Sequence, residues 1–283
     1  MKQLNIFAFA DEASTMIDGQ ITAMLRNQLQ GLEIRGVDGV NISDISLAKA
    51  KEVHRKLSDN GLRVWSIGSP IGKIPVNGDH ATHTEAFRRT LEIAFVLEAE
   101  NIRLFSYYIE EGKDPADYRD AVIDHLGALL AFGEGSGIRL CHENEKGIYG
   151  DNAVRCLDLL NTFPNLYGIF DPANFIQCGQ DTLEAWEMLH SRICYLHIKD
   201  ALKDGTVVPA GYGEGHLPEI LAAYIAQGGS AVTVEPHLQA FSGLDHLERP
   251  KEDRKLGTGF HFKDHDESFD KACSSLRDIL NSL

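Results

Sequence analysis

Strand-like and helix-like segments alternate eight times along the chain. Each expected strand is a short apolar run rich in β-branched or aromatic residues, and each is followed by apolar residues at helical spacing. The expected strands are Leu4–Ala10, Leu32–Arg35, Leu62–Ile67, Ile102–Tyr107, Ile138–Glu143, Tyr167–Asp171, Ile193–Asp200 and Ala231–Glu235. Eight such units in 283 residues predict an α/β fold, a (β/α)8 TIM barrel, with one domain over residues 1–283.

Several expected helices have recognisable ends. A helix over about Ser46–Asn60 stops at Gly61, a residue type that favours the left-handed conformation after a helix. Asp181 begins a helix with the pattern of a capping box, and Asp151 is expected to cap the helix before the sixth strand. An open doubly wound sheet is the alternative fold, but no glycine-rich turn that could bind a dinucleotide follows the first strand.

Composition and charge exclude several classes of protein. The formal net charge of −15 disfavours a surface for nucleic acid or for an anionic membrane. No apolar run approaches the ~20 residues that span a bilayer, and no signal peptide is evident, so we expect a cytoplasmic protein. The five cysteines show no paired spacing, which argues against a disulfide framework. The sequence leaves open whether the chain forms a homo-oligomer.

Four successive strands end in residues that can bind a metal or carry a proton. The fifth strand ends at Glu143, the sixth at Asp171 and the eighth at Glu235, and the seventh carries His197 near its end. The carboxyl ends of the strands of such a barrel converge on one face, where active sites lie. Any one of these residues alone could merely cap the following helix. Four in succession predict a metal site, because a polar group at the end of a buried strand needs a partner.

Three carboxylates and one imidazole form a mainly oxygen-donor set. Such a set suits a single divalent ion, and we expect Mn²⁺, with Mg²⁺, Co²⁺ or Zn²⁺ as alternatives, because no thiolate selects zinc. A metal there can polarise a carbonyl and an adjacent hydroxyl of a substrate. A carboxylate beside the substrate can then remove a proton from the neighbouring carbon and return one, through an enediolate.

Two basic residues near these strand ends are candidates for substrate binding. Lys199 lies two residues past His197 and points to the same side of the strand. It is expected to hold a substrate oxygen, or else to pair with a carboxylate such as Glu33 or Glu235. His237 follows Glu235 by two residues and is expected either to contact substrate or to be a hydrogen-bonded loop residue.

Three further features leave alternatives open. Glu145 has the same parity as Glu143 and is the alternative metal ligand. The glycine-rich segment Gly211–Gly215 is expected to form a tight active-site loop, and a phosphate site is the alternative. The segment Gln239–His265 is long for a loop, and we expect it to form a lid or a dimer contact.

The chain resembles the xylose-isomerase-like TIM-barrel superfamily, and in particular its broad sugar phosphate isomerase/epimerase branch. The segments that carry this resemblance are Phe9–Glu12, Gly31–Gly36, Ser69–Lys73, Cys141–Lys146, Phe170–Phe175, His197–Asp200 and Glu235–Leu238. Members of the superfamily include sugar isomerases and epimerases, inosose dehydratases and the endonuclease IV group. The resemblance implies that Glu143, Asp171, His197 and Glu235 hold one metal ion. It also implies that Glu143 and Glu235 are the catalytic acid/base pair.

This chain departs from the sugar epimerases at two positions. Many ketose epimerases of the group place a substrate-binding histidine three residues after the metal-binding aspartate, and this chain has Asn174 there, which we expect to take the substrate-binding role. Lys199 is also unusual at its position.

The expected function is therefore that of a divalent-metal-dependent sugar isomerase or epimerase of carbohydrate metabolism, acting on a small sugar or polyol-ketone. An inosose-dehydratase-like lyase is the alternative. An endonuclease IV-like DNA-repair enzyme, which the acidic charge disfavours, and a non-catalytic sugar-binding barrel are the weaker alternatives.

Overall fold

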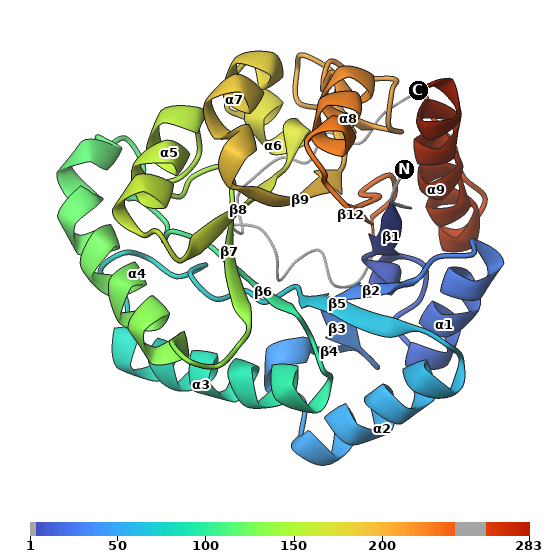
Figure 1. Ribbon diagram of the computed structural model, residues 1–283, viewed down its shortest axis with the longest axis horizontal. Coiled ribbons are helices and arrows are strands. Elements are labelled where there is room, and N and C mark those ends of the chain that lie inside the picture. Colours follow the sequence, from blue (N-terminus) through green and yellow to red (C-terminus); the bar gives the residue numbers. More distant parts are fainter. Residues whose placement is uncertain (1–3, 241–258) are drawn as a thin grey trace.

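Eight parallel strands close into a barrel in the computed structural model of this chain, which describes residues 4–240 and 259–283. The strand order around the barrel is β1-β12-β9-β8-β7-β6-β5-β2, and helices surround it (Figure 1). The barrel strands are β1 (Asn5–Ala8), β2 (Gly31–Ile34), β5 (Arg63–Ile67), β6 (Asn101–Leu104), β7 (Arg139–Glu143), β8 (Leu166–Phe170), β9 (Ile193–Ile198) and β12 (Ala231–Val234). The predicted (β/α)8 barrel is confirmed.

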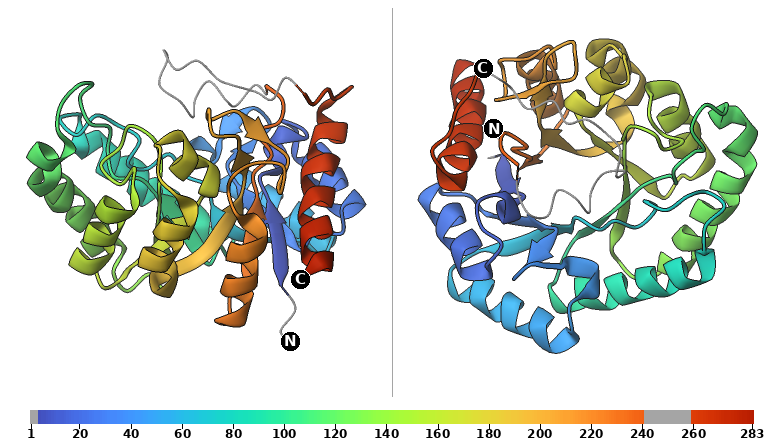
Figure 2. Two further views of the ribbon diagram at one scale, coloured as in Figure 1. Left: turned by 90° about the horizontal axis from the view of Figure 1, so that it is seen from above. Right: turned by 180° about the vertical axis from the view of Figure 1, so that it is seen from behind.

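The helical layer follows the order of the chain, and its last helix, α9, packs beside α1 and α8, which closes the ring (Figure 2). The helices are α1 (Ile17–Arg26), α2 (Leu47–Asp59), α3 (His80–Val96), α4 (Arg119–Gly133), α5 (Ala153–Thr162), α6 (Pro172–Gln177), α7 (Thr182–Leu189), α8 (Leu217–Ala226) and α9 (His265–Ser282). Short 3-10 helices cover Ala10–Glu12, Ile42–Asp44, Pro115–Tyr118 and His190–Arg192. Two small antiparallel sheets pair β3 (Gly36–Val37) with β4 (Val40–Asn41), and β10 (Asp200–Ala201) with β11 (Val207–Val208).

The expected helix ends are correct in two cases and wrong in one. Gly61 has a φ of +69°, as expected of a residue that ends a helix. Asp181 caps α7 by accepting a hydrogen bond from the backbone N–H three residues later. The expectation for Asp151 is wrong, because α5 begins one residue later than expected and Asn152 accepts the capping bond. The Asp151 carboxylate instead forms an ion pair with Arg155.

Inward-pointing side chains of the strands fill the barrel interior. The layer farther from the carboxyl ends of the strands is largely apolar and consists of Phe7, Trp65, Cys141, Ile169, Tyr195 and Ala231. Because every second side chain of a strand points inward, the layer above it contains the residues two positions further along. On β7 this residue is Glu143, on β9 it is His197, and after β8 it is Asp171. This acidic layer therefore lies directly on the largely apolar one.

Two expectations concern parts of the chain outside this barrel core. Residues 241–258, most of the expected lid, lie outside the described residues. None of the helices that the structure describes is long and apolar enough to cross a membrane.

Candidate metal and active site

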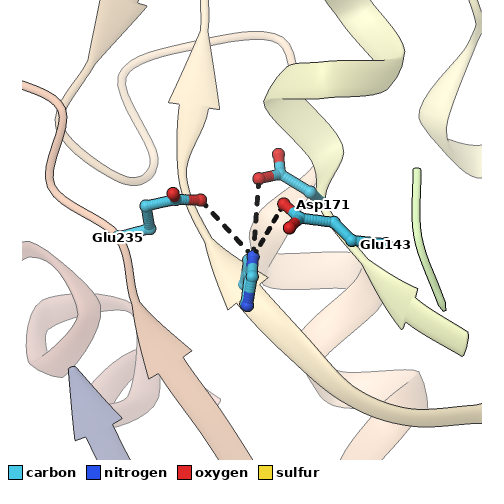
Figure 3. Close-up of side chains that lie close together, drawn as sticks. Glu143, Asp171 and Glu235 are labelled. Carbon is cyan, nitrogen blue, oxygen red and sulfur yellow. Dashed lines mark hydrogen bonds and ion pairs between the residues drawn. The ribbon is translucent and has the colours of Figure 1, made fainter. Parts of the chain in front are cut away.

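Four side chains from four neighbouring strands meet at the carboxyl end of the barrel. Glu143, Asp171, His197 and Glu235 each offer one donor atom, and these atoms lie within 4.8 Å of one another. All four residues are at most 3% exposed. In Figure 3, Glu235 approaches from one side of the cluster, and Asp171 and Glu143 approach from the other. The structure thus brings together the residues that the sequence analysis singled out.

Carboxylates contact both ring nitrogens of the His197 imidazole. Its Nδ1 is 3.0 Å from Glu143 Oε1 and 3.4 Å from Glu235 Oε2, and its Nε2 is 3.0 Å from Glu33 Oε2. Burial alone would lower the pKa of His197, but Glu143 and Glu33 raise it well above its usual value. Glu33 also accepts a hydrogen bond from the Tyr195 hydroxyl at 2.9 Å. Glu33 therefore fixes the ring so that Nδ1 points into the cluster.

An arginine lies behind each of the two glutamates. Arg103 Nη1 donates to Glu143 Oε2 at 3.0 Å, and Arg35 Nη1 donates to Glu235 Oε1 at 3.3 Å. Burial would raise the pKa of Glu143, but His197 and Arg103 lower it to about 2. Burial would likewise raise the pKa of Glu235, yet nearby cations, Lys199 first, hold it well below its usual value. The neighbouring cations therefore favour the ionised form of both glutamates, in which they can act as ligands or bases.

Asp171 uses its two oxygens differently. Its Oδ1 accepts a hydrogen bond from the backbone N–H of Asn174 and so caps α6. Its Oδ2 is buried and accepts no hydrogen bond from any residue that the structure describes, although the Lys199 ammonium lies 2.8 Å away. Burial raises the pKa of Asp171 to about 7, despite the charge of Lys199. This buried carboxylate oxygen thus accepts no hydrogen bond from a described residue and faces the other three residues of the cluster. Such a position fits a metal ligand.

The three expected substrate-binding residues all border the cluster. Lys199 Nζ is 3.1 Å from Glu235 Oε2, so the ion pair considered as its alternative role is present. Asn174 Nδ2 donates to Glu143 Oε1 at 3.2 Å. His237 Nε2 lies 3.4 Å from Glu235 Oε1. Each side chain thus contacts a glutamate of the cluster, and its role toward substrate stays a prediction.

The sequence analysis missed two residues that shape the site. Arg103 stands between Ile102 and Leu104 inside a buried strand, and a charge at such a position signals a buried ion pair. Asn144 and Asp171 exchange two hydrogen bonds of 2.9 Å, from the Asn144 side chain to the Asp171 backbone and back. This exchange fixes the end of β7 against the end of β8.

Contacts outside the cluster bear on two alternatives that the sequence left open, Glu145 as the metal ligand and a phosphate site at Gly211–Gly215. Glu145 forms an ion pair with Lys73 at 2.8 Å, and it is Glu143 that joins the cluster. The backbone N–H groups of Gly211, Gly213 and Gly215 all donate to the Asp200 carboxylate at 2.9–3.0 Å. The chain's own carboxylate thus occupies these amides, as a tight loop requires, and they do not offer a phosphate site.

Comparisons with known proteins agree on one fold. A family model described as a xylose isomerase-like TIM barrel matches residues 27–249. One similar solved structure is the IOLI protein with a bound zinc atom, at a TM-score of 0.73 and 18% identity, covering 100% of this chain and 99% of that one. No curated protein matches the sequence.

Two further solved structures are similar over their whole length. A D-allulose 3-epimerase from Methylomonas sp., in complex with D-allulose, has a TM-score of 0.73 and 17% identity, covering 100% of this chain and 98% of that one. A probable 3-DHS dehydratase, AsbF, from Bacillus anthracis has a TM-score of 0.72 and 15% identity, covering 98% and 99%. At such identities the likeness shows a shared fold, and the chemistry must be argued from the residues themselves.

Proposed function

Because the chain belongs to the xylose isomerase-like TIM-barrel family, we propose that it is a divalent-metal-dependent isomerase or epimerase of a small keto sugar or polyol-ketone. One observation carries this proposal. Three buried carboxylates and an imidazole converge at the carboxyl end of the barrel, and two of the carboxylates, Glu143 and Glu235, approach from opposite sides (Figure 3). A metal site flanked by two bases suits proton transfer at a carbon next to a carbonyl.

The four clustered residues would hold the metal. Oxygen donors predominate, so Mn²⁺ is the ion we propose, with Mg²⁺, Co²⁺ and Zn²⁺ as alternatives. The zinc atom in the IOLI structure supports the idea that barrels of this shape accommodate a divalent ion. When bound, the ion would polarise the substrate carbonyl and stabilise the negative charge that develops on its oxygen.

The chain's own residues would move the proton. Neighbouring cations favour the ionised forms of Glu143 and Glu235, so either would take a proton from the carbon beside the carbonyl, and the other would return one from the opposite side. Arg103 and Arg35 bind the oxygens of these carboxylates that face away from the cluster, which fixes their orientation. The Lys199 ammonium lies where it could hold a substrate oxygen, and we propose that Asn174 and His237 bind further hydroxyl groups.

Exchange of carbon-bound hydrogen with solvent tests this proposal directly. The protein, loaded with Mn²⁺, is incubated in D₂O with unphosphorylated ketopentoses, ketohexoses and inososes, and Mn²⁺ is removed before NMR. We expect deuterium to enter at the carbon next to the carbonyl of at least one of these compounds. Glu143→Gln and Glu235→Gln should each slow that exchange by about 10²-fold or more, the typical contribution of a positioned acid or base. Glu145→Gln is the matched control, because Glu145 pairs with Lys73 outside the cluster, and it should keep most of the exchange rate.

The products separate the isomerase from its lyase alternative. An isomerase or epimerase yields a sugar of unchanged mass apart from the deuterium, whereas a dehydratase yields a product lighter by one water. Loss of water would assign the lyase reaction to the same residues. Absence of exchange with every compound, from a protein shown to bind the metal, would refute the proposed proton transfer.

A further inference from the structure

The ring of Phe9 lies where the two arginines of the site come together. Phe9 directly follows β1 and is fully buried, and its backbone N–H donates to the carbonyl of Val234 at 3.0 Å. The guanidinium carbons of Arg35 and Arg103 lie over this ring, 4.4 Å and 5.1 Å from its centre. One ring therefore contacts both of the cations that bind the paired glutamates.

The two guanidinium groups carry like charges in a buried place. Arg35 is 3% exposed and Arg103 is 2% exposed. Burial lowers the pKa of Arg103, and the charge of Arg35 lowers it too, although three glutamates, Glu143 first, raise it overall. The face of an aromatic ring is negative and attracts a cation. The Phe9 ring therefore offsets part of the repulsion and keeps both groups beside their glutamates.

Close packing holds the Phe9 ring in its orientation. A Cβ atom on Gly68 would lie 2.6 Å from Cε1 of Phe9, so glycine is needed for the backbone to approach the ring this closely. The carbonyl of Gly68 in turn accepts a hydrogen bond from Arg103 Nη2 at 3.2 Å. The rings of Phe9 and His197 are 5.3 Å apart and nearly perpendicular, at 81°, a geometry that aromatic pairs favour. The ring therefore has little freedom to turn away from the two cations.

A second ring contacts only part of this arrangement. The centre of the Phe105 ring is 4.9 Å from the guanidinium carbon of Arg103 and 4.4 Å from the ammonium of Lys73. Among the rings that the structure describes, Phe9 is the one over which both arginines lie. Phe105 is therefore a matched control, because its described contacts include Arg103 and not Arg35.

We propose that Phe9 is a positioning residue for both paired glutamates: its ring holds Arg35 and Arg103, and these in turn hold Glu235 and Glu143. Loss of the ring face would let both guanidinium groups shift, and the two carboxylates would lose their fixed orientation together. The part of this inference that concerns catalysis rests on the proposed proton transfer. A displacement of about 1 Å at reacting groups can cost about 10²-fold in rate.

The first measurement needs neither metal nor substrate. Urea unfolding of the chelator-treated protein gives double-mutant cycles between Phe9→Leu and either Arg35→Met or Arg103→Met. Leucine keeps much of the apolar bulk and lacks the ring face, so we expect each coupling to change the unfolding equilibrium constant by about threefold to thirtyfold. The control, Phe105→Leu, should couple with Arg103→Met by a similar factor and with Arg35→Met by less than about twofold.

The second measurement separates the charge distribution of the ring from its size. Fluorine atoms withdraw electrons from the ring face and change the bulk of the ring little. Replacing Phe9 by phenylalanines with one, two and three ring fluorines should therefore weaken both couplings step by step, and this series still decides the question if Phe9→Leu fails to fold.

The same variants are then compared in the Mn²⁺-loaded protein. The fluorinated series should lower the kcat of deuterium exchange step by step. Phe9→Leu should lower kcat about tenfold or more and change KM less than about threefold, because it disturbs the placement of the bases and not the binding of substrate. A ring that merely fills space would show neither the stepwise trend nor this division between kcat and KM.

Two outcomes would overturn the inference. The first is a coupling of Phe9 with both arginines that is no larger than the coupling between Phe105 and Arg35. The second is a wild-type protein that exchanges deuterium and whose kcat is unchanged by Phe9→Leu and by the fluorinated rings. A wild-type protein that exchanges with no compound would instead refute the proposed function, whereas couplings of the expected size would still support the hold of the ring on the two arginines.

Discussion

Arg103→Met removes one of the two buried guanidinium groups behind the paired glutamates. Arg103 is 2% exposed, and besides Glu143 it hydrogen-bonds the carbonyl of Gly68 at 3.2 Å. The guanidinium also lies 4.9 Å from the ring centre of Phe105. Methionine keeps much of the apolar stem, so the substitution chiefly removes the charge and its hydrogen bonds. The Glu143 carboxylate then stays buried with one cation fewer.

The expected loss of stability follows from the depth of this ion pair. Removing one partner of a buried pair costs about 3–5 kcal/mol. The lower end applies here, because His197 still contacts the other oxygen of Glu143. In a double-mutant cycle with Glu143→Gln, we expect a coupling energy of about 2–3 kcal/mol. The reason is that Arg103→Met leaves the buried Glu143 charge without this partner, and Glu143→Gln removes that charge. Urea unfolding of the four proteins at neutral pH, with a chelator present, measures this coupling.

An exposed ion pair of the same chain is the matched control. Arg55 and Asp59 are 3.1 Å apart on α2, and their side chains are 66% and 61% exposed. The same cycle with Arg55→Met and Asp59→Asn should give a coupling of at most about 0.5 kcal/mol. If the coupling between Arg103 and Glu143 is no larger than this, the arginine does not hold the glutamate charge and the reasoning is refuted.

Three further substitutions test other parts of the molecule. Burial lowers the pKa of His83 from 6.5 to about 4, so the folded state binds fewer protons than the unfolded state between these values, and stability falls as the pH drops through that window. When the pH is lowered from 7 to 5, the unfolding free energy of wild type should therefore fall by about 1–2 kcal/mol more than that of His83→Gln, as measured by urea unfolding. Asp200→Asn replaces a carboxylate that accepts four backbone N–H bonds, and we expect a loss of about 2–3 kcal/mol and faster proteolysis within Gly211–Gly215. Lys199→Met should destabilise the metal-free protein by about 3 kcal/mol and tighten Mn²⁺ binding in isothermal titration calorimetry, because the ammonium competes with the ion for Asp171 and Glu235; unchanged affinity would contradict this competition.

The barrel was predictable because its signal repeats along the chain. Eight apolar runs of strand length, each followed by a helical pattern, leave few other ways to bury both faces of every strand. The end of α2 at Gly61 was equally readable, since few residues other than glycine adopt a positive φ at low cost. The start of α5 was not, because Asp151 and Asn152 are adjacent and both are good caps. Only the packed position of the helix decides between them.

The four clustered residues were predictable from the sequence, whereas the arginine that binds Glu143 was not. Parity along a strand places Glu143 two residues above Cys141, so the sequence indicates which layer each acid occupies. The partner of Arg103 depends instead on the register between neighbouring strands. Arg103 pairs with Cys141 across β6 and β7, and its long side chain therefore reaches the next inward residue of β7, Glu143. That register is a property of the closed barrel and cannot be read from either strand alone.

The ion pairs of the clustered carboxylates also predict what happens when a metal is removed. Structural zinc sites hold small domains together, and such domains unfold without their ion. In this barrel the chain itself supplies a cation for each clustered carboxylate, namely Arg103 for Glu143, Arg35 for Glu235 and Lys199 for Asp171. Chelation should therefore abolish deuterium exchange while circular dichroism still shows a single cooperative thermal transition. Loss of that transition on chelation would mean that the ion, and not the buried arginines and lysine, balances the acidic layer.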